Sequence, residues 1–300
     1  MGLTGAGFGA GRPDGTGPAA GPGRSARLRS ELRQHPSLVV GGVLAAATLI
    51  VAIAGHIAPP HNPLALSPGH ALAPPGPAHW FGTDQFGRDV FSRVLYGLGM
   101  DVAIGLIVAA LAFAVGSMAG LVSGYLGGWI DDIVMRVADL LMSFPSFLLA
   151  LSIAVVLGNT VRNVIIAVTI AYVPYILRLT RGSVLAVRGA DYVLGARAVG
   201  ASRSRVMTLH VLPNTVGPSV VQATLLVGWA ILDVSGLSFL GVGIQPPSPE
   251  LGVQIAQGAS YITSGQWWVS VFPGVAIILA VLAVNFLGDY ADDKLRGRGS

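Results

Sequence analysis

Four of the six histidines lie in or just before one proline-rich stretch, and imidazole is a common metal ligand: His56, His61, His70 and His79. Their spacing matches no metal-ligand pattern. The chain has no cysteine, so it offers no thiolate ligand, disulfide or cysteine nucleophile, and no Ser/His/Asp arrangement stands out. The sequence therefore predicts neither a catalytic residue nor a metal site.

A nucleotide site is excluded by the scarcity of lysine. A phosphate-binding loop needs GxxxxGK[ST], because its backbone amides cradle the phosphates and its lysine reaches the β and γ positions. The only lysine is Lys294, and the residues DYADD precede it. We therefore expect a chain that is not an enzyme and binds no cofactor, with any ATP and Mg²⁺ bound by partner subunits.

Two aspartates lie inside apolar stretches, where a charge is costly unless it faces a partner or a water-filled cavity. Asp139 follows Arg136 by about one helical turn, which favours a pair between them. Asp233 has no basic residue within a turn. It is interpreted either as part of a translocation path or its gate, or as a hydrogen-bonding group across the helix bundle. Gln222 and Ser235 are further candidates for the path.

Residues 188–213 form a polar interruption between two long apolar stretches. The pattern predicts a short amphipathic helix that breaks at Gly200, then a second helix that passes Met207 and ends at Pro213. A loop that only fixed orientation would need its charges, but no glycine at a helix break and no small residues around it. Small side chains let a helix seat closely in a groove on another protein, so we interpret this segment as a docking site.

The composition places the chain in a membrane. Hydrophobic residues make up 53% of the 300 and charged residues 11%, whereas a soluble domain carries about 25% charged residues. Six apolar stretches each approach the ~20 residues that cross the hydrocarbon core. We predict an all-α membrane protein whose transmembrane domain covers residues 36–296. Its six helices are expected at about 38–58, 100–124, 133–157, 162–182, 214–240 and 268–289.

The basic residues orient these spans. With the N-terminus inside, 15 of the 18 Lys and Arg residues fall in cytoplasmic segments and three, Arg88, Arg93 and Arg162, fall outside. This asymmetry predicts a multi-pass protein of the plasma membrane with both termini in the cytoplasm and a cytoplasmic loop at 184–213. The same placement accounts for the net charge of +4 without a nucleic-acid partner.

Two segments outside the spans have distinct compositions. Residues 1–35 are rich in glycine and proline and then basic, which predicts a disordered cytoplasmic arm. The external loop 59–98 begins with prolines and then shows apolar residues at helical spacing from Asp89 onwards. That spacing predicts an amphipathic helix on the membrane surface.

Small residues and prolines mark the expected packing of the spans. A stripe of small residues at four-residue spacing shares one helix face: Ala112, Gly116, Gly120 and Gly124. Such a stripe lets two backbones approach closely, and packing within the chain is favoured over a dedicated dimer contact. Pro145 and Pro174 lie inside two predicted spans and are expected to kink them.

The polar interruption also resembles a known motif. Residues 191–214, DYVLGARAVGASRSRVMTLHVLPN, are similar to the cytoplasmic EAA loop of bacterial ABC-importer permeases. That pattern reads EAA, three residues, Gly, nine residues, Ile, one residue, Leu-Pro. Ala196 matches its second alanine, Gly200 its glycine, and Leu212-Pro213 its final pair. Three positions replace the glutamate, the first alanine and the isoleucine: Leu194, Gly195 and His210.

Four further stretches extend the resemblance over about 36–296, in the expected order. They are similar to the C-type permease of dipeptide and oligopeptide importers, and nickel importers of the same family share them. The stretches are FGTDQFGRDVFSRVLYG (81–97), GYLGGWIDDIVMRVADLLMSFPSFLLAL (124–151), GLSFLGVGIQPPSPELG (236–252) and NFLGDYADDKLR (285–296).

The resemblance implies a fold, partners and a contact site. The fold would be the type I permease fold of ABC importers, with a second, B-type permease completing a pore within the membrane lipid. Two ATPase subunits would lie beneath it, and an external binding protein would deliver di- or oligopeptides. Residues 191–201 would be a coupling helix, with Asp191 as the candidate substitute for the missing glutamate. The implied ATPase contacts are Asp191, Tyr192, Leu194, Gly195, Ala196, Arg197, Gly200, Ala201, Arg203, Leu212 and Pro213.

Two alternatives remain at this point. Within the family, the solute would be nickel or another small molecule instead of a peptide. From a different class, the chain would be a transporter driven by an ion gradient, or a membrane scaffold. A secondary transporter usually shows inverted repeats and more buried ionisable groups, and neither is visible in this sequence.

Overall fold

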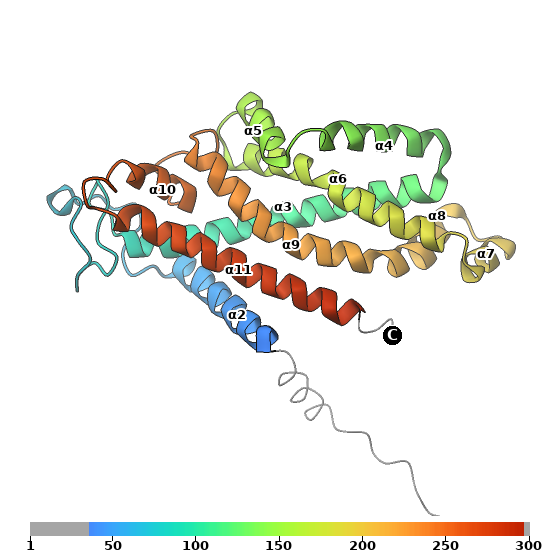
Figure 1. The fold of residues 1–300 in the computed structure, drawn as a ribbon, viewed down its shortest axis with the longest axis horizontal. Coiled ribbons are helices and arrows are strands. Elements are labelled where there is room, and N and C mark those ends of the chain that lie inside the picture. The colour runs from blue at the N-terminus through green and yellow to red at the C-terminus, as the bar shows by residue number, and fades with distance from the viewer. Residues whose placement is uncertain (1–35, 297–300) are drawn as a thin grey trace, which may run out of the picture.

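The computed structural model describes residues 36–296, without the side chains of 36–41, 56 and 289–296, so the predicted arm 1–35 lies outside the described residues. The described chain is a bundle of helices with no β-strand (Figure 1). Four of its helices are long and apolar enough to cross a membrane. They are α3 (Val90–Leu126), α6 (Val161–Val187), α11 (Trp268–Arg296), and a continuous helix made of α8 (Arg203–Val206), a π-helical turn (Met207–Val211) and α9 (Leu212–Phe239).

The predicted third span is broken rather than kinked. It consists of α4 (Gly128–Met142) and α5 (Ser146–Leu157), which meet at 92° and together would count as a fifth crossing. Pro145 stands immediately before α5, where a residue without an N–H cannot continue the hydrogen bonds of α4. Pro174, by contrast, lies inside α6, which runs through it. Helix α2 (Pro36–Ile57) covers the first predicted span.

The predicted surface helix is wrong as a separate element. It forms the first turns of α3, which runs for 37 residues from its N-cap Asp89, whose carboxylate accepts a hydrogen bond from Ser92 N (2.8 Å). Val90 and Val94 are buried in the bundle instead of facing lipid. Their apolar periodicity therefore reflects a helix packed against its neighbours at the end of the membrane span.

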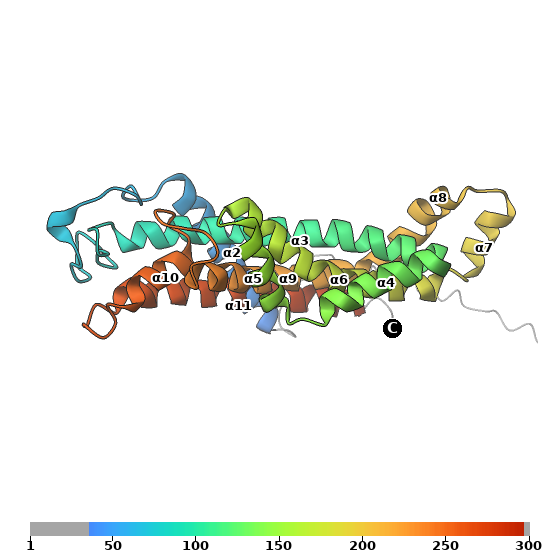
Figure 2. The same cartoon turned by 90° about the horizontal axis from the view of Figure 1, so that it is seen from above.

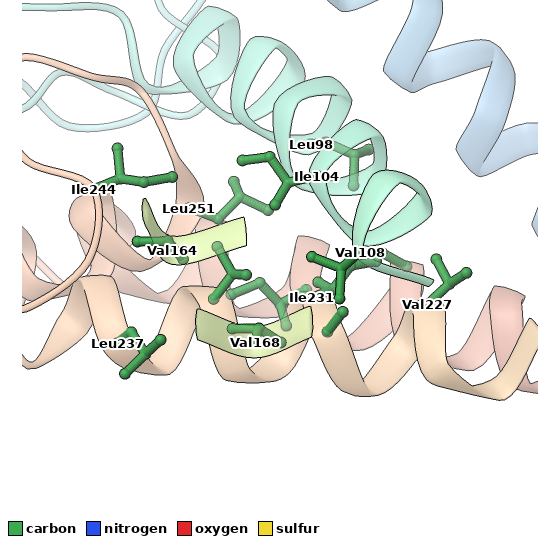
Figure 3. Close-up of a cluster of buried hydrophobic side chains, with 14 of the residues drawn as sticks. Leu98, Ile104, Val108, Val164, Val168, Val227, Ile231, Leu237, Ile244 and Leu251 are labelled. Atoms are coloured by element: carbon green, nitrogen blue, oxygen red, sulfur yellow. The ribbon is translucent and has the colours of Figure 1, made fainter. Parts of the chain in front are cut away.

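Helix α3 lies at the centre of the bundle, against α2, α6, α9 and α11 (Figure 1). Its small-residue stripe faces α6. A side chain added at Gly116 would lie 2.7 Å from Ile176 Cβ, and one at Gly120 would lie 2.5 Å from the carbonyl oxygen of Leu177. Packing within the chain is thus confirmed. The core around α3 includes Leu98, Ile104, Val108, Val164, Val168, Val227, Ile231, Leu237, Ile244 and Leu251 (Figure 3).

The predicted pair of Asp139 with Arg136 is wrong. Helix α4 lies beside α6, and Asp139 forms its ion pair with Arg178 of that helix. A second pair joins the same two helices, because Arg181 donates to both carboxylate oxygens of Asp131 at 2.6 Å. A contact between helices thus replaces the contact within one helix that sequence spacing favoured.

Two groups of short elements occupy opposite ends of the bundle (Figures 1 and 2). Helices α7 (Asp191–Ala198) and α8 lie at one end. The segment 58–89 and α10 (Leu251–Ala259) lie at the other.

Candidate functional site

Helix α7 is short and mostly exposed. Asp191 lies in its first turn and Arg197 in its last, so each charge faces the end of the helix dipole that favours it. Val193 is the buried residue of α7, at 0% exposure, whereas Tyr192 and Leu194 on either side are nearly half exposed. The helix therefore has one fully buried side chain, while most of its other residues are exposed.

Gly200 ends α7 through a left-handed turn, with φ of +83°. The amide of Ala201 donates to Ala196 O (3.1 Å) and the amide of Gly200 to Arg197 O (2.9 Å). These two bonds make a Schellman cap, in which a glycine avoids the strain that a Cβ atom would meet. No described atom lies within 4 Å of the position of such a Cβ. The helix break is confirmed, and the space in front of Gly200 is open.

Pro213 does not end the second helix, which is a correction to the sequence interpretation. The chain continues from α8 through the π-helical turn into α9, and Pro213 lies in the first turn of α9. The amide of Leu212 bonds to Met207 O, five residues back, so the backbone widens just before the proline. Inside this continuous helix the proline has no N–H to donate to the preceding turn, and the widened π-helical turn lies where that hydrogen bond is missing.

A small apolar cluster holds α7 and α8 against the bundle. It is separate from the main core, and Val193 and Val206 supply the contributions of the two short helices. We call residues 188–211 the coupling hairpin. Its buried contacts outside the hairpin lie on two long helices, α3 and α6, and the hairpin itself continues into α9. The buried members of the cluster are Leu121 and Tyr125 of α3, Val184 of α6, Val193, Val206 and Val211.

Arginines add polar contacts to the same region. Arg197 Nε donates to Tyr125 Oη (3.0 Å), and its guanidinium carbon lies 4.8 Å from the centre of the Tyr125 ring. Arg188 donates to the carbonyl oxygen of Gly124 (3.0 Å). These two arginines thus join the segment 188–211 to the end of α3. The hairpin and α3 border an open pocket of about 570 Å³, lined by Tyr125, Leu126, Arg188, Gly189, Leu194, Arg197, Ala201 and Arg203.

Most of the predicted ATPase contacts lie together on the outer surface of the coupling hairpin. Ala196 and Ala201 are half-buried and face the apolar cluster. Leu212 and Pro213 belong to the first turn of α9 rather than to α7. Pro213 is exposed, and the exposed members of the set within the hairpin are Asp191, Tyr192, Leu194, Gly195, Arg197, Gly200 and Arg203.

Asp233 forms the hydrogen bond across the bundle that was one of its two interpretations. Tyr172 of α6 donates its hydroxyl to Asp233 Oδ2 at 2.6 Å. The tyrosine is 1% exposed, whereas the aspartate is only half-buried. Trp229, one turn before Asp233, packs edge-on to Tyr172 and is 42% exposed. Asp233 therefore borders both the core and an open surface of α9.

The three predicted path residues do not share one face. Gln222 and Asp233 are eleven residues apart, which is close to three full helical turns, so they point the same way from α9. Ser235 points elsewhere: it is 5% exposed and donates a long hydrogen bond of 3.5 Å to Asp101 Oδ2. The structure therefore removes Ser235 from the candidate path, because its side chain is inside the packing of α9 against α3.

Sequence reasoning missed a pair of buried acids beside Ser235. Asp101 of α3 is 1% exposed and Glu250, the N-cap of α10, is 0% exposed. Leu251 N lies 3.3 Å from Asp101 Oδ2, so the two acids are neighbours. One oxygen of each, Asp101 Oδ1 and Glu250 Oε1, finds no hydrogen-bond partner among the described residues. Asp101 lies within the predicted span 100–124, so the test for ionisable residues inside apolar stretches would have found it.

The sequence is similar to known transport permeases. The family described as binding-protein-dependent transport system inner membrane component matches residues 116–297. The chain is 41% identical over 270 residues to the probable D,D-dipeptide transport system permease protein of Escherichia coli strain K12, covering 90% of each protein. It is 37% identical over 265 residues to the dipeptide transport system permease protein of Alkalihalophilus pseudofirmus, covering 88% of this chain and 87% of that one.

A solved structure shares the fold. The crystal structure of an amino acid ABC transporter with histidines contains a chain that superposes with a TM-score of 0.52 at 14% identity. The match covers 67% of this chain and 94% of that one. At this level of identity the similarity concerns the arrangement of helices alone.

Proposed function

Because the chain belongs to the family of binding-protein-dependent transport system inner membrane components, we propose that it is the pore-forming permease of an ATP-driven importer of di- and oligopeptides. The observation that carries this proposal is the match of nearly the whole chain to permeases named for dipeptides. Membership of a transport family, together with several helices able to cross a membrane, makes it a multi-pass transport component rather than an enzyme.

In the proposed arrangement the chain crosses the membrane six times. Helix α2 supplies the first crossing and the broken α4–α5 pair the third, with both termini in the cytoplasm. The excess of basic residues on one side supports this orientation. The coupling hairpin then faces the cytoplasm, and α10 with the segment 58–89 faces outwards.

The coupling hairpin is the proposed docking site for an ATPase subunit. Its exposed, small-residue surface around Gly195 and Gly200 leaves space for a groove to close over α7. Val193 and Arg197 connect α7 to α3 and α6, and α8 continues directly into α9. A movement of the ATPase would therefore shift the ends of three long helices together, which is the change that alternating access requires.

The remaining partners follow from the same proposal. A second, B-type permease would complete the pore, and two ATPase subunits would bind ATP and Mg²⁺, leaving this chain without a cofactor. An external binding protein would present the peptide. We place Gln222 and Asp233 on the translocation path because they share one face of α9, beside the exposed ring of Trp229.

The docking proposal is tested by Gly200→Trp in the assembled transporter. A tryptophan at this open position would block a groove from closing over α7. We expect uptake of a radiolabelled dipeptide into proteoliposomes to fall at least tenfold and stimulation of the ATPase by the binding protein to be lost. Membrane insertion and the amount of assembled complex should stay unchanged.

Gly128→Trp is the matched control. Gly128 also has a positive φ (+60°), is exposed, and has no described atom within 4 Å of an added Cβ, but it is the first residue of α4 rather than part of the coupling hairpin. This variant should transport normally. Normal uptake by Gly200→Trp would refute the docking role, and Ni²⁺ that competes with peptide for uptake would refute the peptide assignment.

A further inference from the structure

Two histidines and an aspartate meet where the segment 58–89 joins α3, at the end of the bundle opposite α7 (Figure 1). His79 Nδ1 lies 2.9 Å from Asp89 Oδ1, and His61 Nδ1 lies 3.6 Å from Asp89 Oδ2. The two imidazole rings are 5.4 Å apart between centres. One ligand atom from each of the three residues falls within 4.8 Å of the others, so they can converge on one ion.

The charge balance around Asp89 favours a cation at this point. Its side chain is 4% exposed, and a buried carboxylate is costly unless an opposite charge accompanies it. The neighbouring arginines do not supply that charge, because Arg88 and Arg93 both pair with Asp84, at 2.6 and 3.5 Å. The described groups that face the Asp89 carboxylate are instead the amide of Ser92 and the two imidazoles.

The three residues are also held in place by their surroundings. The amide of His61 donates to Ser92 Oγ (2.9 Å), which fixes the backbone of His61 to the first turn of α3. Asp89 is fixed as the N-cap of the same helix. A cavity of about 140 Å³ opens beside them, lined in part by Trp80 and Phe91, and has room for a water ligand. Such support from the surrounding shell is what distinguishes a ligand site from a chance cluster.

We propose that His61, His79 and Asp89 form a site for a divalent cation of the zinc class. Two imidazole nitrogens and one carboxylate oxygen suit Zn²⁺, whereas Ca²⁺ and Mg²⁺ prefer shells made of oxygen. Ligands of one zinc lie about 3.3 Å apart in tetrahedral geometry. The cluster must therefore contract at its widest point, and the half-exposed His61 has the freedom to move.

The bound ion would crosslink the segment 58–89. It would join residue 61, just beyond α2, and residue 79 to the start of α3, closing a loop of nearly thirty residues. Closing such a loop restricts the chain when it is unfolded, so the ion stabilises the folded segment. The spacing of the histidines does not indicate this site. The third ligand is an aspartate, and the three residues come together only because the chain folds back between them.

The test is zinc binding to the full-length chain in its assembled transporter, purified through an affinity tag that contains no histidine. The protein is stripped with EDTA, equilibrated with Zn²⁺, passed through a gel-filtration column and analysed for zinc per chain. Competition with a chromophoric chelator gives the dissociation constant. We expect the wild type to hold one zinc more per permease than the double variant His61→Ala/His79→Ala, with the affinity at this site reduced at least tenfold in that variant.

Two further variants keep the result interpretable. Asp89→Asn preserves an oxygen that can cap α3 but removes the ligand charge, so its zinc affinity should also fall at least tenfold while its gel-filtration profile stays unchanged. His210→Ala, at the other end of the bundle, should bind zinc like the wild type. Equal zinc content in wild type and double variant would overturn the proposal, as would displacement of the zinc by equimolar Ca²⁺ or Mg²⁺.

Discussion

Asp233 shows how one residue can border both the packed interior and an open surface. Its Oδ2 atom accepts a hydrogen bond from the buried hydroxyl of Tyr172. This bond satisfies the hydroxyl, which would be costly without a partner inside the bundle. Its half-buried position, on the same face as Gln222, leaves part of the carboxylate towards the proposed path. The structural and transport roles can therefore be separated by changing one partner at a time.

Tyr172→Phe should destabilise the protein without removing the charge of Asp233. The variant loses the hydrogen bond and leaves the carboxylate without its donor, at a cost of about 1–3 kcal/mol. We expect a lower thermal unfolding midpoint in detergent. Asp233→Asn keeps an acceptor for Tyr172, so its midpoint should stay near the wild type, while peptide uptake falls about tenfold. Unchanged uptake in Asp233→Asn would remove this residue from the path.

At the scale of elements, α7 depends on very little packing. Val193 is its one fully buried side chain among the described residues, and the Schellman cap at Gly200 fixes its end. A weakly anchored helix can dock on a partner and still move relative to it. The continuity of α8 with α9, in contrast, makes that side of the hairpin stiff.

Val193→Ala should loosen α7 selectively. Removal of two buried methyl groups costs about 1–2 kcal/mol, so amide hydrogen exchange in residues 191–201 should become about tenfold faster. Val199→Ala is the control in the same segment, because Val199 is 85% exposed and should leave exchange unchanged. Equal effects of the two substitutions would show that the apolar cluster does not anchor the hairpin.

Over the whole molecule, the buried acids Asp101 and Glu250 join three helices at the end opposite the coupling hairpin. Asp101 belongs to α3, Ser235 of α9 donates to it, and Glu250 begins α10. Burial raises the pKa of the Glu250 carboxyl above its ordinary value of 4.5. The folded protein thus holds a proton that the unfolded chain releases, and stability is lost as pH rises through the raised pKa.

Glu250→Gln should therefore weaken the dependence of stability on pH. Glutamine keeps an oxygen for the amide of Val253 but has no proton to release. At pH 8 its unfolding midpoint should exceed that of the wild type, by about 2–4 °C for each kcal/mol recovered, and the difference between pH 8 and pH 5.5 should shrink. Asp132→Asn makes the same charge change at an exposed site and should leave the pH profile unaltered. A wild-type profile in Glu250→Gln would contradict this assignment.

Much of this architecture could be predicted from short stretches of sequence. Crossing helices follow from runs of about twenty apolar residues, because lipid offers the backbone no other partner. The break at Gly200 followed from one residue that tolerates a positive φ, and the stripe from Gly116 to Gly120 indicated a close helix contact. Each of these signals depends on neighbours within a few turns of one helix.

The site contacts depend instead on residues far apart in the chain. Tyr172 and Asp233 are separated by 61 positions, and Arg178 and Asp139 by 39. His61 meets Asp89 only because the segment 58–89 folds back on α3. No periodicity encodes which side chain will stand opposite another across a bundle, because helix packing sets that choice. The helical membrane class and the helix break at Gly200 were therefore accessible from the sequence, whereas the partners of the buried charges required the fold.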